Sequence, residues 1–173
     1  MSKVDHITSG LGHEVSPEEA KAEFSKSITL LERLHQKLHD LIHLALTEAG
    51  ITDITSVQGL LLYNLGEHEI KVGELKTRGF YLGSNVSYNL KKLVNLGYVS
   101  QEQARHDKRS ARVSLTVKGH RVRKIITDLF DDDIEKILTS CPLEFEEIQT
   151  SGKVLEVWDQ FWAQQLGNPS RQD

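Results

Sequence analysis

The sequence predicts a mainly α-helical chain with one small β-hairpin, and three observations carry that prediction. Apolar residues recur at three- and four-residue spacing along most of the 173 residues, which is typical of amphipathic helices. Residues 16–19 and 55–58 have the Ser/Thr-x-x-Glu/Gln pattern of capping boxes, which mark helix starts. Only residues 98–117 change to the two-residue period of strands.

Composition places the chain among globular proteins of the cell interior. Hydrophobic residues make up 38% and charged residues 27%, which are values of folded domains. The single cysteine, Cys141, excludes an internal disulfide and fits a reducing compartment. No run of eighteen apolar residues occurs, and residues 1–15 lack the apolar core of a signal peptide. We therefore expect a cytoplasmic protein with no membrane partner.

A long first helix is expected over residues 16–50, after a flexible tail over residues 1–15. Ser16 can cap it and Gly50 can end it. At 1.5 Å per residue it would be about 50 Å long, more than a domain of this size needs, so a second copy of the chain is expected to pack on it. Its apolar seam comprises Phe24, Ile28, Leu31, His35, Leu38, Ile42 and Ala45.

Shorter elements follow the first helix. The second capping box opens a leucine-rich helix that ends near Gly66. Gly79 breaks a short helix, and Ser84 is the expected N-cap of another that ends at Gly97. The elements in order are a helix over 55–66, a very short strand at 70–71, a helix over 72–78 and a helix over 84–97.

A β-hairpin and two helices complete the chain. The strands are expected over residues 98–103 and 111–117, with Val113, Leu115 and Val117 facing inward. Between them residues 105–110 form a charged tip. One helix begins near Thr116, and the last begins after Pro142, with a bend at Ser151–Gly152 left open. A second flexible tail is expected over residues 167–173.

The order of these elements is that of a winged helix-turn-helix, placed over residues 51–118. In such a unit the second helix of the pair enters the major groove of DNA. Its polar face carries hydroxyl, amide and ammonium groups, which can read base edges and bind phosphates. The residues assigned to this DNA-binding face are Ser84, Asn85, Ser87, Tyr88, Lys91 and Lys92.

The charged tip of the hairpin is the second expected DNA contact. Arg105, Lys108 and Arg109 can enter a minor groove, where the negative potential favours arginine. Asp107 would repel phosphate, so we expect it to buttress an arginine of the same loop through a charge-assisted hydrogen bond. The alternative is a plain solvated turn.

Charge is distributed unevenly along the chain. Residues 71–124 hold thirteen Lys or Arg against three acidic residues, a formal charge of +10, so the remainder carries −14 within a total of −4. A basic block of this kind points to a polyanionic partner. We expect double-stranded DNA. The alternatives are a solvated lysine-rich surface, or a winged-helix module used for protein–protein association.

The same residues resemble the MarR family of transcriptional regulators. Residues 107–110 and 113–119 resemble that family's wing and the helix start after it, and residues 93–99 resemble the end of its recognition helix. The resemblance covers about residues 16–166. Within the family, residues 60–66 and 81–94 are similar to LdtR-type regulators, which are linked to L,D-transpeptidase genes and cell-wall remodelling.

The resemblance implies a homodimer in which residues 16–50 and 119–166 form a dimerisation layer. Two modules would then meet successive major grooves of a pseudo-palindromic operator. It also implies control by a small aromatic or amphipathic effector in a cleft between the layer and the module. Lys108 departs from the family pattern, because many members have a second arginine there.

The first expected helix carries three regularly spaced histidines. His35, His39 and His43 recur at four residues, and histidines at that spacing can share a metal. His35 lies on the apolar seam and the three turn progressively around the helix, so we favour interfacial or pocket-lining histidines over a metal site. With Tyr63 they form the candidate effector pocket, and no metal is expected.

No catalytic constellation is present in the sequence. It has no Gly-rich phosphate loop, no nucleophile elbow and no acid pair on one element. Cys141 lies in acidic sequence, whereas a redox-sensing cysteine needs positive charge nearby, and we expect it to be inert. Trp158, Phe161 and Trp162 are assigned to core or dimer packing rather than to a ligand site. We expect neither an enzyme nor a cofactor.

Overall fold

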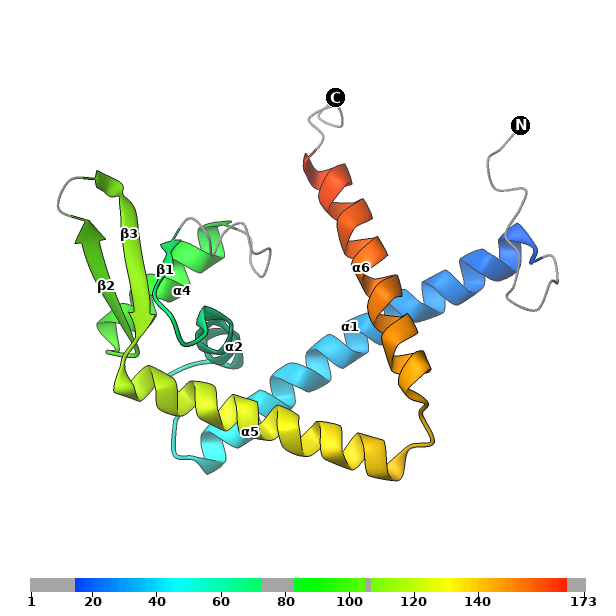
Figure 1. Cartoon of the computed structure of the whole chain (residues 1–173), viewed down its shortest axis with the longest axis horizontal. Helices are drawn as coiled ribbons and strands as arrows, with labels where there is room; N and C mark the ends of the chain where they lie inside the picture. Colours follow the sequence, from blue (N-terminus) through cyan, green and yellow to red (C-terminus); the bar gives the residue numbers. More distant parts are fainter. Residues whose placement is uncertain (1–14, 73–82, 105–106, 168–173) are drawn as a thin grey trace. The chain divides into compact units, whose positions relative to one another are not determined.

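The computed structural model describes residues 15–72, 83–104 and 107–167 (Figure 1). The side chains of residues 83–85, 103–104 and 107–110 lie outside that description. The elements are α1 (Pro17–Glu48), α2 (Ser56–Leu65), β1 (Ile70–Lys71), α4 (Gly83–Asn95), β2 (Val99–Ala104), β3 (Asp107–Leu115), α5 (Val117–Ser140) and α6 (Phe145–Gly167). The predicted fold class, mainly α with a small hairpin, is confirmed. The two tails and the helix expected at residues 72–78 fall largely outside the described residues.

Both predicted capping boxes are present. The Ser16 hydroxyl accepts from the Glu19 N–H at 3.2 Å, and the Glu19 carboxylate accepts from the Ser16 N–H at 3.0 Å. At the start of α2, the Thr55 hydroxyl accepts from the Gln58 N–H at 3.3 Å, and Gln58 Oε1 accepts from the Thr55 N–H at 3.1 Å. These bonds satisfy N–H groups that the first turn of a helix leaves without partners.

The chain divides into two compact units, residues 1–129 and 130–173. In the first unit the core lies among α1, α2, α4, the sheet and the first half of α5. Gly59 explains the close approach of three of these helices, since a Cβ there would lie 3.1 Å from Ile126 and 3.2 Å from Leu46. The other apolar residues of this core include Ile42, Leu61, Leu62, Leu65, Val86, Leu90, Leu93, Val99, Val113 and Val122.

The apolar seam expected on α1 is only partly correct. Ile42 is buried, as is the neighbouring Leu46, but Phe24 and Leu31 further toward the N-terminus are exposed. The helix also has a second apolar face that the seam does not include. Its members are exposed in the single chain and comprise Leu30, Leu34, Leu41 and Leu44.

The sheet is antiparallel with strand order β1-β3-β2. Ile70 pairs with Val113, and Val99 pairs with Leu115, so the short strand β1 and the hairpin share β3. Figure 1 shows β2 and β3 side by side, with β3 leading directly into α5. Because β3 already begins at Asp107, the expected six-residue tip was too long, and its residues 107–110 belong to the strand.

Residue 117 also corrects the hairpin prediction. Val113 faces inward as expected and is 1% exposed, but Val117 is 90% exposed and is the first residue of α5. The predicted alternation of inward-facing residues includes Val117, but β3 ends at Leu115 and Thr116 already lies outside the strand. Its hydroxyl accepts from the Gly119 N–H at 3.2 Å and so caps α5.

The second unit consists of the second half of α5 and of α6. The helix α6 runs unbroken through residues 151–152, where the Ser151 hydroxyl donates to the carbonyl of Ile148 at 2.8 Å. None of its residues is buried in the single chain. Within residues 15–72, 83–104 and 107–167, no helix is both long and apolar enough to cross a bilayer.

Candidate nucleic-acid interface

The helix α4 has one face in the core and one in solvent. Val86, Leu90 and Leu93 are buried and anchor it, as their spacing predicts. On the outer side Ser87 and Lys91 are exposed, Tyr88 is 69% exposed, and Lys92 is half-buried. The helix begins at Gly83, so Ser84 lies in its first turn and not at the N-cap position. The side chains of Ser84 and Asn85 lie outside the described residues.

A buried amide bond joins α4 to α2. Gln58 is 2% exposed, and its Nε2 donates to Oδ1 of Asn89 at 3.0 Å. The sequence predicts that Gln58 caps α2, but it does not predict the contact between Gln58 and Asn89. A signal was present, because Gln58 is a polar residue that begins the leucine-rich stretch of α2.

A second polar cluster fixes the C-terminal end of α4. The Tyr98 hydroxyl donates to Oδ1 of Asp53 at 2.5 Å, and Lys118 Nζ donates to the other oxygen of Asp53 at 2.9 Å. Lys118 also donates to the carbonyl of Leu96 at 3.2 Å and lies 3.8 Å from the centre of the Tyr98 ring. These contacts tie the α1–α2 connection and the start of α5 to the end of α4. Sequence reasoning missed this cluster.

The Asp53 cluster predicts a pH dependence of stability. Hydrogen bonds from Tyr98 and then from Lys118 lower the pKa of the Asp53 carboxyl. A carboxyl with a lowered folded pKa stabilises the fold fully above its unfolded pKa of about 4, and this contribution is lost as pH falls through the folded value. We expect urea denaturation curves from pH 7 to pH 3 to show a smaller loss of stability for Asp53→Asn than for the wild type. Equal losses in the two proteins would show that the cluster does not contribute.

The wing residues are placed by their strand alone. Asp107, Lys108 and Arg109 lie at the start of β3, opposite the end of β2, where Ala104 pairs with Asp107. Their side chains and the whole of Arg105 lie outside the described residues. The DNA contacts of the wing and the buttressing role of Asp107 therefore stay predictions.

The basic block is partly neutralised within the fold. Among the residues that the structure describes, four cations of the block pair with carboxylates, and three of those carboxylates precede the block in the sequence. The pairs are Arg112–Glu69 at 3.2 Å, Lys118–Asp53 at 2.9 Å, Arg123–Glu67 at 3.0 Å and Lys124–Asp128 at 2.9 Å. The unbalanced charge of +10 therefore overstates the positive charge that the block presents to a partner.

The histidines of α1 do not form one cluster. His39 is half-buried, and its Nδ1 lies 3.1 Å from the hydroxyl of Ser56. Burial, and then the nearby His35, lower the pKa of His39, which favours the neutral ring that can share this bond. His35 contacts His39 edge to face at 4.6 Å, whereas His43 is exposed. Among the described residues no group of three His, Cys, Asp or Glu could hold a metal.

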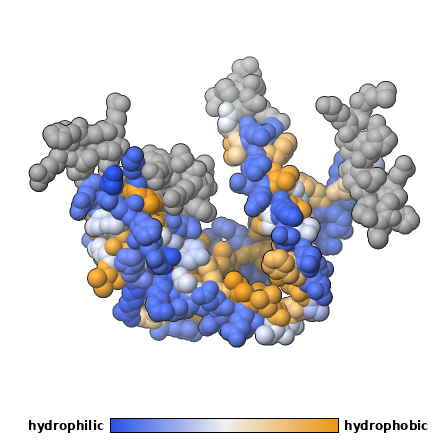
Figure 2. Space-filling view, in the orientation of Figure 1, coloured by the Kyte–Doolittle hydropathy of each residue, from blue (hydrophilic) through white to orange (hydrophobic). Residues whose placement is uncertain are grey.

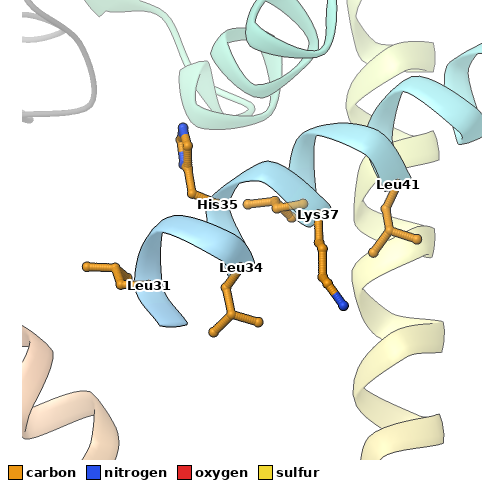
Figure 3. Close-up of a pocket in the computed structure, with 6 residues that line it drawn as sticks. Leu31, Leu34, His35, Lys37 and Leu41 are labelled. Atoms are coloured by element: carbon orange, nitrogen blue, oxygen red, sulfur yellow. The ribbon is translucent and has the colours of Figure 1, made fainter. Parts of the chain in front are cut away.

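A shallow groove of about 470 Å³ lies along the middle of α1 (Figure 3). In Figure 3, Leu34, Lys37 and Leu41 point to one side of the helix and His35 points to the other. Of the four residues of the candidate effector pocket, His35 lines this groove, while Tyr63 is a half-buried residue of α2. The lining residues are Leu31, Leu34, His35, Lys37, Leu38 and Leu41.

Comparisons with known proteins bear on the module and on the fold. Residues 50–110 match the model of the MarR family. A curated relative is the exopolysaccharide II synthesis transcriptional activator ExpG of Rhizobium meliloti (strain 1021), which is 41% identical over 93 residues. The match covers 54% of this chain and 48% of the relative, so the chain spans about half of the relative's length. The relative's name describes a transcriptional activator.

Solved structures of the family share the fold. MarR of Staphylococcus aureus in complex with salicylate and kanamycin aligns with a TM-score of 0.67 and 20% identity, covering 85% of this chain and 95% of that one. A mutant MarR from E. coli in complex with operator DNA aligns with a TM-score of 0.60 and 26% identity, covering 78% and 94%. Together these comparisons show that the chain has the winged-helix fold of the MarR structures and that residues 50–110 are similar to the MarR family.

Proposed function

We propose that this chain is a homodimeric, sequence-specific DNA-binding transcriptional regulator of the MarR family. The observation that carries the proposal is the two-sided helix α4. Its apolar stripe is buried in the module, while Ser87, Tyr88 and Lys91 face solvent. A helix presented in this way can lie in a major groove, and the E. coli neighbour is bound to operator DNA.

Each set of predicted contacts has a different task in this proposal. Hydroxyl and amide groups of α4 read base edges, and Lys91 and Lys92 bind phosphate or guanine. On the wing, Arg105, Lys108 and Arg109 enter the adjacent minor groove, with Asp107 as their buttress. Base contacts decide which sequence is bound, while phosphate contacts set the affinity for every duplex.

The exposed apolar faces support self-association. One lies on α1, where Leu44 is 54% exposed and does not line the groove, and the others lie on α5 and α6. Figure 2 shows hydrophobic residues reaching the surface along α6. Large exposed apolar patches are rare on monomers and mark interaction surfaces. A two-fold dimer would place two copies of α4 for two half-sites of a pseudo-palindromic operator.

We also propose control by a small amphipathic effector. The groove on α1 combines leucine side chains with the ammonium group of Lys37, which suits an apolar ligand that carries a carboxylate. The Staphylococcus aureus neighbour is a complex with salicylate, a ligand of that kind. His35 lines the groove, and His39, His43 and Tyr63 stay candidates for the same pocket.

Two similarities point to different genes as targets of the regulator. Similarity to LdtR-type regulators over residues 60–66 and 81–94 favours L,D-transpeptidase and cell-wall genes. The name of the curated relative favours activation of exopolysaccharide synthesis. Genomic footprinting with the full chain would decide between these two targets, because each predicts protected sites upstream of different genes.

The DNA-binding proposal is tested by fluorescence anisotropy. A duplex selected by the protein from a random library is compared with a scrambled duplex over a salt series. We expect tight, selective binding and a steep fall of affinity with salt, because neutralising about 6–10 phosphates releases their counterions. Weak and equal binding to both duplexes would favour the alternative, a winged-helix module that binds another protein.

Two variants are expected to distinguish base contacts from contacts with the DNA backbone and minor groove in this assay. Tyr88→Ala should change the preferred sequence, by about 1–3 kcal/mol at one base pair if a base contact is lost.

Arg109→Ala should instead weaken binding to all duplexes and make the affinity less dependent on salt concentration. If Arg109→Ala binds both duplexes as the wild type does, the wing has no part in DNA binding.

A further inference from the structure

We propose that Gln58 and Asn89 form a positioning pair, a buried amide bond that fixes the angle at which α4 presents its reading face. The inference rests on the proposed function and deepens it. It concerns two residues that need not touch DNA and that act through the helix which does.

The environment of Gln58 is unusual for an amide. At 2% exposure it is buried as deeply as Leu61 and Leu65 of the same helix, and among the described residues the only other hydrogen-bonding side chain buried to this degree is that of Tyr98. Its Oε1 accepts from the Thr55 N–H at 3.1 Å, and its Nε2 donates to Asn89 Oδ1 at 3.0 Å. The first turn of α2 is therefore connected by a directional bond to the middle of α4.

The apolar anchors of α4 supply no such direction. Val86, Leu90 and Leu93 are held by burial, which is not directional and tolerates a small roll of the helix. Side-chain ends lie about 6 Å from a helix axis, so a roll of about 20° moves them by about 2 Å. Such a shift breaks a hydrogen bond to a base edge. Asn89 follows Tyr88 directly, so the bond to Gln58 also sets where Tyr88 points.

Stability alone does not require this pair. An apolar side chain of similar volume at position 58 would fill the same space, and replacing a buried hydrogen bond by apolar groups on both sides is often nearly neutral for folding. We therefore expect the pair to act on sequence discrimination more than on stability. This separates its role from that of an ordinary core residue.

The test measures the ratio of affinities for two duplexes, one selected by the wild type from a random library and one scrambled. For Gln58→Leu we expect this ratio to fall about tenfold, the equivalent of one lost base contact, with binding to the scrambled duplex unchanged. The matched control is Thr55→Ala, which removes the other bond of the same capping box, the Gln58 N–H to the Thr55 hydroxyl at 3.3 Å. This control should keep the wild-type ratio although it destabilises α2.

A double-mutant cycle assigns the effect to the bond itself. Asn89→Leu should lower the ratio, and the double variant should lose no more than the larger single loss, because both changes remove the same interaction. If leucine disturbs the core, as seen by circular dichroism, Gln58→Met is the replacement, since its flexible chain fits the same space.

Three results would overturn the proposal. They are a Gln58→Leu ratio within about twofold of the wild type, an equal loss in Thr55→Ala, and losses that simply multiply in the double variant. A wild type that enriches no sequence from the library would instead remove the proposed function, and the positioning role with it. A wild type that selects a sequence while Gln58→Leu retains it would overturn the positioning role alone.

Discussion

The variant Gly119→Ala is expected to lose about 3 kcal/mol of its free energy of unfolding, the upper part of the range for overpacking. A Cβ at this position would lie 2.2 Å from the backbone carbonyl oxygen of Tyr98. Backbone cannot swing aside as a flexible side chain does, and that oxygen already accepts from the Thr116 N–H at 3.0 Å. The clash would therefore separate the start of α5 from the end of α4.

The measurement is thermal and urea denaturation followed by circular dichroism. For a chain of this size, a loss of about 3 kcal/mol lowers the melting temperature by about 10 °C. Gly152→Ala in α6 is the matched control, because a Cβ added there would meet no atom within 4 Å and alanine is the better helix former. The control should be neutral or gain up to about 1 kcal/mol. A Gly119→Ala protein as stable as this control would show that α5 can shift without cost.

Local signals explain why most elements could be predicted from the sequence. Ser16, Thr55 and their partners three residues later act within one helical turn, so a capping box is visible in four letters. The stripe Val86, Leu90 and Leu93 is likewise a property of one helix. The start of β3 could not be predicted in this way. Residues 107–110 belong to the strand because β3 pairs with β2, and they show no alternation of apolar and polar residues.

Long-range contacts explain what could not be predicted. Tyr98 and Asp53 are 45 residues apart in the sequence, and Gln58 and Asn89 are 31 apart. Nothing in the spacing of single residues shows which polar groups the fold will bring together. The basic block shows the same limit, because the ion pairs of Arg112 and Arg123 involve acidic residues outside it.

Replacing Leu155 by arginine is expected to have the largest effect on assembly. In the single chain Leu155 is 45% exposed and Trp162 is 39% exposed, seven residues further along α6. Ile148 lies seven residues before Leu155 and is exposed as well, so the three form one apolar stripe. If a second copy covers this stripe, the arginine must bury a charge without a partner at a cost of several kcal/mol. We expect the dimer to weaken by at least about a hundredfold, the equivalent of about 3 kcal/mol.

The same variant should lose operator binding while its α4 and wing stay unchanged. Two linked modules gain about 10²–10⁴ in affinity over one, so a monomer should bind the selected duplex at least about a hundredfold more weakly. Gln160→Arg is the matched control, because Gln160 is an exposed residue of α6 away from the stripe. Sedimentation equilibrium and anisotropy on both variants test the two expectations together. If Leu155→Arg stays dimeric, the stripe is not the interface, and the apolar faces of α1 and α5 are the remaining candidates. A monomer that binds as tightly as the wild type would show that one module is sufficient for recognition.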